Sequence, residues 1–244
     1  MGARITWLGH STVAVVLDGT TLVTDPVLRR RIAHLRRDAS AATPPRPDAV
    51  LVSHLHYDHL DLPSLALIGR DVPLVVPRGA KRFLRRHTNV EETEPGAVVE
   101  IGRVRVEVVE AVHDGRRRPF GAPVPALGFV LRGSRSIYFA GDTELFDGMG
   151  ALGPLDVGLI PVAGWGPKVG PGHLDPAAAA QSLTLLRPEI AIPIHWGTYG
   201  IVGRARGDRS PAEQFADEAA TVAPDVDVRI LDVGGTLELD AAPA

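Results

Sequence analysis

The chain has 244 residues, a length that suits one large domain or two small ones. Hydrophobic residues make up 45% of the chain and charged residues 23%, which excludes disorder, collagen and coiled coil as its main organisation. The formal net charge of −3 gives no support to a nucleic-acid partner held by bulk positive charge, and none is expected. Cysteine is absent, so any bound metal must be held by His, Asp or Glu.

Short β-branched runs bounded by turn residues predict strands along most of the chain. In chain order the predicted strands are Arg4–Leu8, Val13–Asp18, Thr21–Asp25, Ala49–Ser53, Val72–Val76, Val98–Val109, Ala126–Leu131, Ser136–Ala140, Val157–Pro161, Ile190–Ile194 and Val226–Asp232. Helical periodicity predicts the helices Leu62–Ile68, Ala80–Arg86, Glu144–Met149, Pro176–Leu186 and Pro211–Val222. No segment has the apolar length of a signal peptide or a membrane span, so we expect a cytoplasmic protein.

Two of the predicted helices have clear start signals. Asp175 before Pro176 is typical of an N-cap followed by proline at the first helical position. Ser210, with Glu213 three residues later, predicts a capping box. Strands dominate and helices are interspersed, which favours a single sheet-based α/β domain over residues 1–244, with residues 29–47 as an insertion over one rim.

The segment after the strand that ends near Val52 carries the most informative motif. It reads Ser53-His54-Leu55-His56-Tyr57-Asp58-His59, an H-x-H-x-D-H pattern. A tight loop at the end of a strand can turn His54 and His56 toward one point, and Asp58 and His59 toward a second point nearby. Imidazole and carboxylate are the ligands that zinc and similar ions take when thiolates are absent. The motif therefore indicates a two-metal geometry.

Further ligands are needed to complete two metal sites, and candidates follow other predicted strands. His113, Asp142 and His195 each come shortly after an apolar strand. Asp25, before Pro26, also ends a strand, where it can hydrogen-bond a ligand imidazole or simply initiate a turn. A single His or Asp after a strand is weak evidence for a metal site. The same pattern after several strands is stronger evidence that these residues bind metal together.

With these motifs in order, the chain resembles the metallo-β-lactamase superfamily of metal-dependent hydrolases over nearly its whole length. The resemblance implies an α/β fold of four layers, an αββα sandwich, with the metals at one edge of two sheets. It implies two divalent ions, zinc as the expected metal and manganese or iron as alternatives. The implied ligands are His54, His56 and His113 for the first ion and Asp58, His59 and His195 for the second, with Asp142 bridging and Asp25 supporting a ligand.

Finer motifs are similar to the group that contains N-acyl-phosphatidylethanolamine-hydrolysing phospholipase D and the L-ascorbate-6-phosphate lactonases. They are the segments 7–12, 172–176 and 195–198, read as Trp-Leu-Gly-His-Ser-Thr, Gly-His-Leu-Asp-Pro and His-Trp-Gly-Thr. In the phospholipase the histidine before the Asp-Pro helix start lies beside the metals. The resemblance therefore makes His173 a candidate catalytic residue here.

The expected activity is hydrolysis of a phosphodiester or a phosphate-bearing ester by a hydroxide that bridges two metal ions. Asp58 would orient the hydroxide while it binds metal, and His173 would protonate the leaving group. The run Arg116-Arg117-Arg118 suits an anionic substrate, or else is a solvated basic loop.

Three other functions stay open at this stage. A lactonase would use the same hydroxide on a cyclic ester, and a nuclease is disfavoured by the net charge and the lack of interleaved aromatic and basic residues. A metal-binding sensor or scaffold without catalysis is the alternative outside enzymes. A homo-oligomer is also left open.

Overall fold

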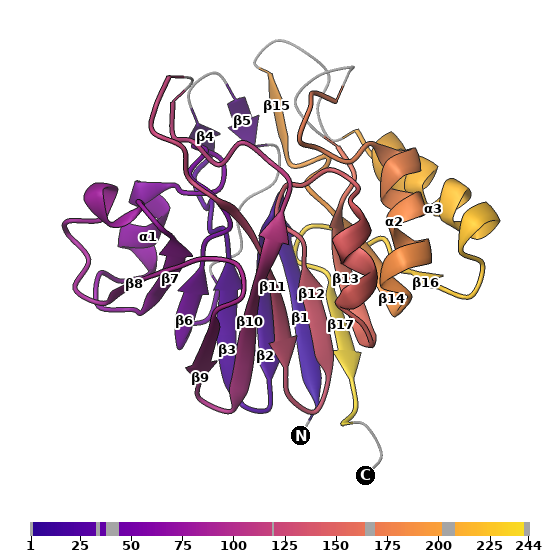
Figure 1. The fold of residues 1–244 in the computed structure, drawn as a ribbon, viewed down its shortest axis with the longest axis horizontal. Coiled ribbons are helices and arrows are strands. Elements are labelled where there is room, and N and C mark those ends of the chain that lie inside the picture. The colour runs from indigo at the N-terminus through magenta and orange to yellow at the C-terminus, as the bar shows by residue number, and fades with distance from the viewer. Residues whose placement is uncertain are drawn as a thin grey trace.

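The computed structural model describes residues 2–32, 35–37, 44–118, 120–163, 169–201 and 208–241. Within these residues the strands form two seven-stranded sheets and one three-stranded sheet (Figure 1). The first sheet has the order β17 (Thr236–Leu239), β1 (Ala3–Gly9), β2 (Thr12–Leu17), β3 (Thr20–Thr24), β6 (Ala49–Leu51), β7 (Leu74–Pro77) and β8 (Val90–Thr93). The second has the order β16 (Asp227–Val228), β14 (Pro188–Ile194), β13 (Leu155–Pro161), β12 (Ser136–Phe139), β11 (Ala126–Arg132), β10 (Val104–Ala111) and β9 (Val98–Ile101).

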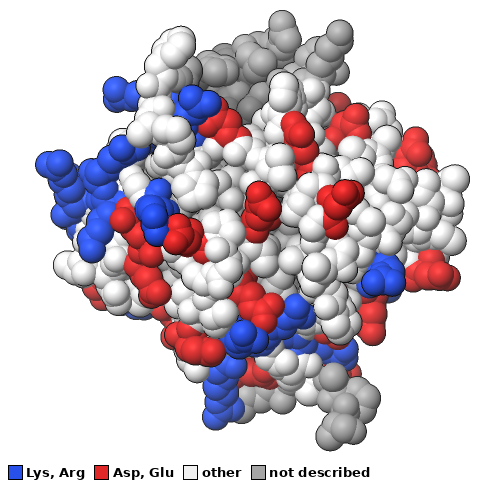
Figure 2. Space-filling model, in the orientation of Figure 1, with Lys and Arg blue, Asp and Glu red and all other residues white. Residues whose placement is uncertain are grey.

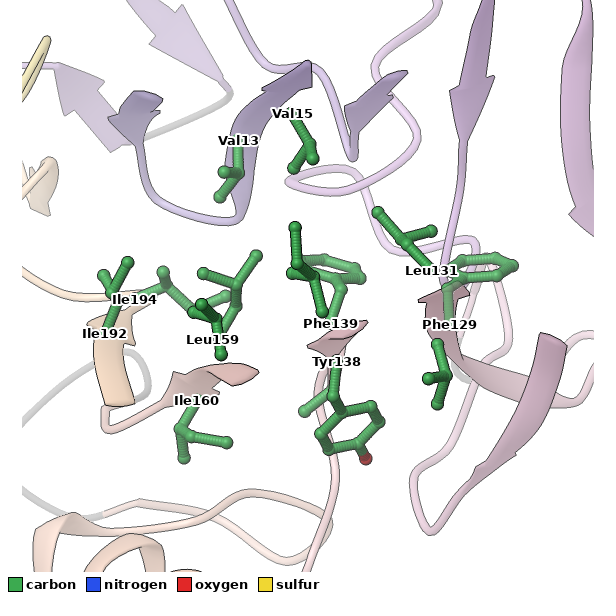
Figure 3. Close-up of a cluster of buried hydrophobic side chains, with 14 of the residues drawn as sticks. Val13, Val15, Phe129, Leu131, Tyr138, Phe139, Leu159, Ile160, Ile192 and Ile194 are labelled. Atoms are coloured by element: carbon green, nitrogen blue, oxygen red, sulfur yellow. The ribbon is translucent and has the colours of Figure 1, made fainter. Parts of the chain in front are cut away.

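Apolar side chains from the inner faces of the two large sheets form the main core. Val13 and Val15 of β2 point toward the second sheet, where Phe139 of β12 lies (Figure 3). Tyr138 and Ile160 point to the opposite side of the second sheet, as the two-residue period of a strand requires (Figure 3). Both faces of the second sheet are therefore buried, which explains its nearly continuous apolar strands.

Helices cover the outer faces of the two sheets (Figure 1). They are α1 (Leu62–Ile68), α2 (Pro176–Leu186) and α3 (Ser210–Val222), with short 3-10 turns η1 (Lys81–Phe83) and η2 (Asp147–Ala151). Leu65 of α1 packs with Val50 and Val52 outside the first sheet, and α2 and α3 pack against the second sheet. The predicted αββα sandwich is confirmed. No helix among the described residues is long and apolar enough to cross a membrane.

Several predicted elements are wrong in extent. The expected strand Val98–Val109 is two strands, because the chain reverses at Gly102, whose φ of +59° suits a glycine turn. The helix predicted over Ala80–Arg86 is only the short turn η1, and the one predicted over Glu144–Met149 is replaced by η2, which begins and ends later. The strand predicted over Val226–Asp232 is only β16. The strands β8 and β17, at the two edges of the first sheet, were not predicted.

One helix start is confirmed and the other is wrong. The Asp175 carboxylate accepts a hydrogen bond from the Ala178 amide at 2.8 Å, so it caps α2 as expected. The cap position of α3 is Arg209, without a side-chain hydrogen bond to the helix. The Ser210 amide instead donates to the Asp208 carboxylate at 3.0 Å. Ser210 is therefore the first residue of the helix and not its N-cap, so the predicted capping box does not form.

Part of the segment 29–47 pairs with β15 (Tyr199–Ile201) to form the third sheet, whose order is β15, β5 (Leu35–Arg37) and β4 (Arg31–Ile32). Residues 33, 34 and 38–43 of this segment lie outside the described residues. The small sheet lies above the upper ends of the large sheets in Figure 1. Its side chains Ile32, Leu35 and Tyr199 form a separate small core with Val27, which precedes β4.

Candidate metal centre

The site is built at one edge of the two large sheets. In the first sheet β1, β3 and β6 run in the same direction, and in the second sheet β10, β12 and β14 do so. Polar residues follow the C-terminal ends of these six strands: His10, Asp25, Ser53 to His59, His113, Asp142 and His195. Strand direction therefore brings together side chains that are far apart in the sequence.

His54, His56 and His113 form the first ligand group. The Nδ1 atom of His56 lies 3.0 Å from Nε2 of His54 and 3.2 Å from Nε2 of His113. Nitrogen ligands of a tetrahedral zinc ion, each ~2.05 Å from the metal, lie about 3.3 Å apart. The three imidazoles therefore have a spacing that suits one ion.

Asp58, His59 and His195 lie together in a second group, as the sequence predicts. Oδ2 of Asp58 is 3.6 Å from Nε2 of His59 and 3.8 Å from Nε2 of His195. A fourth member, His10, was missed by the sequence analysis. Its Nε2 atom donates a hydrogen bond to Oδ2 of Asp58 at 3.0 Å.

Asp142 lies between the two groups. Its Oδ2 atom is 3.2 Å from Nε2 of His59, 3.4 Å from Nε2 of His195 and 4.0 Å from Nε2 of His54. The Nε2 atom of His173 also lies 3.4 Å from this oxygen. The His173 side chain is 20% exposed and that of Asp142 2%, so His173 lies at the solvent side of the centre. The structure thus brings every predicted ligand to one place.

Contacts behind the imidazoles fix which nitrogen faces the centre. His113 and His195 donate from Nδ1 to the carbonyls of Gly172 at 2.7 Å and Ala163 at 2.8 Å. His59 donates from Nδ1 to the Asp25 carboxylate at 2.7 Å, and this carboxylate also accepts from the Ser53 hydroxyl at 2.5 Å. Each of the three rings therefore presents Nε2 to the centre.

Unusual backbone conformations cluster at the site. His10, Asp25 and His195 have φ values of +55°, +34° and +63°, in the region that non-glycine residues rarely occupy. Gly141, before Asp142, has a φ of +63°, and a Cβ there would lie 2.8 Å from both the Leu127 carbonyl oxygen and Ser53 Cβ. Such strain is typical of sites where function fixes side-chain positions.

The predicted substrate arginines have different surroundings. Arg117 donates to the carbonyls of Leu55 at 2.9 Å and Leu60 at 2.5 Å, and its guanidinium lies 3.8 Å from the centroid of the Tyr57 ring. It is thus engaged with the loop that carries the H-x-H-x-D-H motif. Arg116 pairs with Asp114 at 2.7 Å on the surface, and Arg118 is exposed.

Burial and mutual charge shift the pKa values of the cluster. Burial lowers the pKa of His54 well below its ordinary value, that of His10 to about 3 and that of His113 to about 4, so these rings are neutral near pH 7. Burial alone would raise the pKa of Asp58 and Asp142, yet the neighbouring histidines hold both pKa values well below the ordinary value. Burial opposes the change at His59, but the carboxylates of Asp142, Asp58 and Asp25 raise its pKa well above the ordinary value, so the metal-free protein keeps a proton there. Ligand imidazoles bind metal in the neutral form, so metal binding at His59 would release that proton.

The donor set fits divalent metal ions. Oδ1 of Asp142 is buried and has no hydrogen-bond partner among the described residues. Buried polar atoms normally have such partners, and atoms that face a cation are an exception. The residues are all imidazoles and carboxylates, the ligands of zinc, manganese and iron. Fold and site together define a metal-dependent hydrolase of the metallo-β-lactamase type.

Comparison with known proteins agrees with this class. The model of the beta-lactamase superfamily domain matches residues 20–196, and the chain belongs to this superfamily. It is 33% identical to a UPF0173 metal-dependent hydrolase of Methanopyrus kandleri, over 96% of this chain and 99% of the relative. It is 31% identical to an N-acyl-phosphatidylethanolamine-hydrolyzing phospholipase D of Caenorhabditis elegans, over 81% of this chain and 65% of that protein.

Solved structures show the same fold. A metallo hydrolase from Ignicoccus hospitalis matches with a TM-score of 0.73 and 21% identity over 98% of this chain and 99% of that one. A possible metal-dependent hydrolase from Veillonella parvula matches with a TM-score of 0.75 and 17% identity over 98% of this chain and 100% of that one. At these identities the likeness concerns the fold alone.

Proposed function

We propose that this metal-dependent hydrolase cleaves a phosphodiester or a phosphate-bearing ester with two divalent ions, zinc first among them. The observation that carries the proposal is the pair of ligand groups that share Asp142. His54, His56 and His113 would hold one ion, and Asp58, His59 and His195 the other. Bound ions would supply a water nucleophile near neutral pH and polarise the bond to be cleaved.

The protein's own residues would orient the reaction. Asp58 faces the second group with an ionised carboxylate, which can accept a hydrogen bond from water and hold that water in position while it binds metal. His173 lies 3.4 Å from Asp142 at the solvent side, where it can donate a proton to a leaving alkoxide. Asp25 would keep His59 in the tautomer that binds metal.

Positive charge near the site supports an anionic substrate. Arg116 and Arg118 follow His113 on the loop that ends near Val124, and Val124 packs with Ala80 and Leu84. The segment 81–86 beside it exposes Lys81, Arg82, Arg85 and Arg86, and basic side chains gather on that side of the molecule in Figure 2. A phosphate group would be attracted to this side. The name of the C. elegans relative, a phospholipase, agrees with such a substrate.

A lactonase is the second candidate. The same centre can direct water to a cyclic ester, in which case the leaving alkoxide stays in the product and His173 matters less. A sensor or scaffold that binds metal without catalysis is disfavoured because the ligands and His173 are all placed together.

Initial rates on bis(p-nitrophenyl) phosphate and on γ-thiobutyrolactone separate these functions. The protein is loaded in turn with zinc and manganese, and His56→Ala serves as the inactive control. We expect faster turnover of the phosphodiester, abolished by His56→Ala and reduced by about 10²- to 10⁴-fold in His173→Ala at unchanged metal content. A preference for the lactone would favour the second candidate, and no turnover of either ester would favour the sensor.

A further inference from the structure

His10 is the one member of the second ligand group that has no role in the proposed function, although it belongs to the Trp-Leu-Gly-His-Ser-Thr segment. It follows β1 in a buried position, with 2% of its surface exposed. Its Nε2 atom lies 3.0 Å from Oδ2 of Asp58, closer than the 3.6 Å and 3.8 Å of His59 and His195. This contact can mean either a fourth metal ligand or a hydrogen bond to a ligand.

Ring geometry favours the hydrogen bond. Ring centroids of histidines assigned to one ion are 4.6 to 4.9 Å apart in the first group, and those of His59 and His195 are 5.3 Å apart although the two planes are only 16° from parallel. Centroid distance, rather than the angle between planes, therefore distinguishes rings that share an ion. The His10 ring instead lies against that of His195, with centroids 3.9 Å apart and an angle of 38° between the planes. A ring that lies on the face of a ligand ring is poorly directed toward the same ion.

Three hydrogen bonds to the backbone of His10 hold the residue in this position. Its amide donates to the Thr198 hydroxyl at 2.7 Å, and its carbonyl accepts from the Trp7 indole at 2.8 Å and from the His195 amide at 3.0 Å. The φ of +55° at His10 is thereby maintained. The bonds with Thr198 and His195 also tie the end of β1 in the first sheet to the segment that follows β14 in the second.

We propose that His10 is a positioning residue, which donates from Nε2 to Oδ2 of Asp58 and so turns the Asp58 carboxylate toward His59 and His195. A carboxylate oxygen has two lone pairs, so Oδ2 can accept this hydrogen bond and still face the ion. His10 thereby sets the affinity of the second metal site and leaves the first unaffected. The inference rests on the two-ion centre of the proposed function.

Zinc binding to metal-free protein, titrated against a chromogenic chelator, tests the assignment. In His10→Gln the amide nitrogen can replace Nε2 as the donor, and in His10→Met no donor remains. The wild type and His10→Gln should bind two ions with affinities within about threefold of each other. His10→Met should bind one ion normally and the second about 10- to 100-fold more weakly. Visible spectra of the cobalt-loaded proteins should change for the second ion alone.

Two results would overturn the assignment. Normal binding of two ions by His10→Met would show that the hydrogen bond does not matter, and a His10→Gln protein as weak as His10→Met would make the ring itself a ligand. If His10→Met fails to fold, His10→Asn replaces it, because its shorter amide cannot reach Asp58 and should also lose the second ion. A wild type that binds one ion would contradict the two-ion centre itself and this inference with it.

Discussion

Gly172 lies against the ring of His113. Replacement of Gly172 is therefore a simple test of the first ligand group. A Cβ at Gly172 would lie 2.7 Å from Nδ1 of His113, and φ is +79°. Gly172→Ala should therefore displace His113 and weaken binding of the first ion by about 10- to 100-fold. Gly170→Ala is the control, because its Cβ would meet no described atom within 4 Å. Equal zinc affinities in the two variants, measured by chelator competition, would contradict the role given to His113.

Arg117 stabilises the loop of the H-x-H-x-D-H motif, residues 54–60, by hydrogen bonds to its backbone carbonyls. Its guanidinium donates to Leu55 and Leu60, so Arg117→Met would leave these carbonyls without that partner. We expect the variant to lose about 1–3 kcal/mol of unfolding free energy in urea denaturation. Arg116→Met removes only an exposed ion pair with Asp114 and should change stability by less than about 0.5 kcal/mol. A larger loss of unfolding free energy in Arg116→Met than in Arg117→Met would contradict the stabilising role given to Arg117.

The sequence predicted which candidate ligands lie together better than it predicted the residues that support them. Each predicted ligand follows an apolar strand, and strand direction alone brings such residues to one edge. His10 follows a strand in the same way, so its signal was present in the pattern. Its contact with Asp58, however, depends on how the end of β1 lies relative to the loop that follows β6 in the same sheet, which no local pattern records. The role of Arg117 depends equally on a long-range contact.

At the scale of elements, the hydroxyl of Tyr138 on β12 provides a stability test. This hydroxyl is buried without a hydrogen-bond partner in the described part of the chain. Tyr138→Phe removes an unsatisfied polar group and should raise the unfolding free energy by about 1 kcal/mol. Tyr199→Phe, its control on β15, removes a hydroxyl that donates to the Arg29 carbonyl at 2.7 Å and should lower it by a similar amount. Destabilisation by Tyr138→Phe in urea would contradict this account.

Element prediction succeeded where side-chain pattern and burial agree. α2 has the predicted bounds, because Asp175 and Pro176 fix its start chemically. The run Val98–Val109 is uniformly β-forming, so only Gly102 indicated the turn that divides it. Ser210 could cap a helix in isolation, yet the Asp208 carboxylate engages its amide and shifts the start. Edge strands such as β8 have mixed exposure and little periodic signal.

At the scale of the whole molecule, carboxylates that bridge segments make stability depend on pH. Burial by itself would raise the pKa values of Asp156 and Asp18. Hydrogen bonds from Arg135 and Ser136 nevertheless lower the pKa of Asp156, and hydrogen bonds from Ser134 lower that of Asp18. A depressed folded-state pKa stabilises the protein above the unfolded-state pKa of about 3.9, and this contribution is lost as pH falls below about 5. Unfolding free energy of the metal-free protein should therefore decrease from pH 6 to pH 3.

Asp156→Asn isolates the share of one carboxylate in this decrease. The variant should be less stable than the wild type at pH 6, and the difference should shrink as pH falls toward 3, because protonation progressively removes the stabilisation that the wild-type carboxylate provides. Urea denaturation at several pH values measures both curves. Parallel curves would show that Asp156 does not contribute to the acid sensitivity.

The central claim is that the edge of the two sheets holds two metal ions. Anomalous diffraction at the zinc absorption edge, from crystals of the zinc-loaded protein, locates such ions directly. The account predicts two peaks, one among His54, His56 and His113 and one among Asp58, His59 and His195, with Asp142 between them. A single peak, or peaks away from these residues, would contradict it.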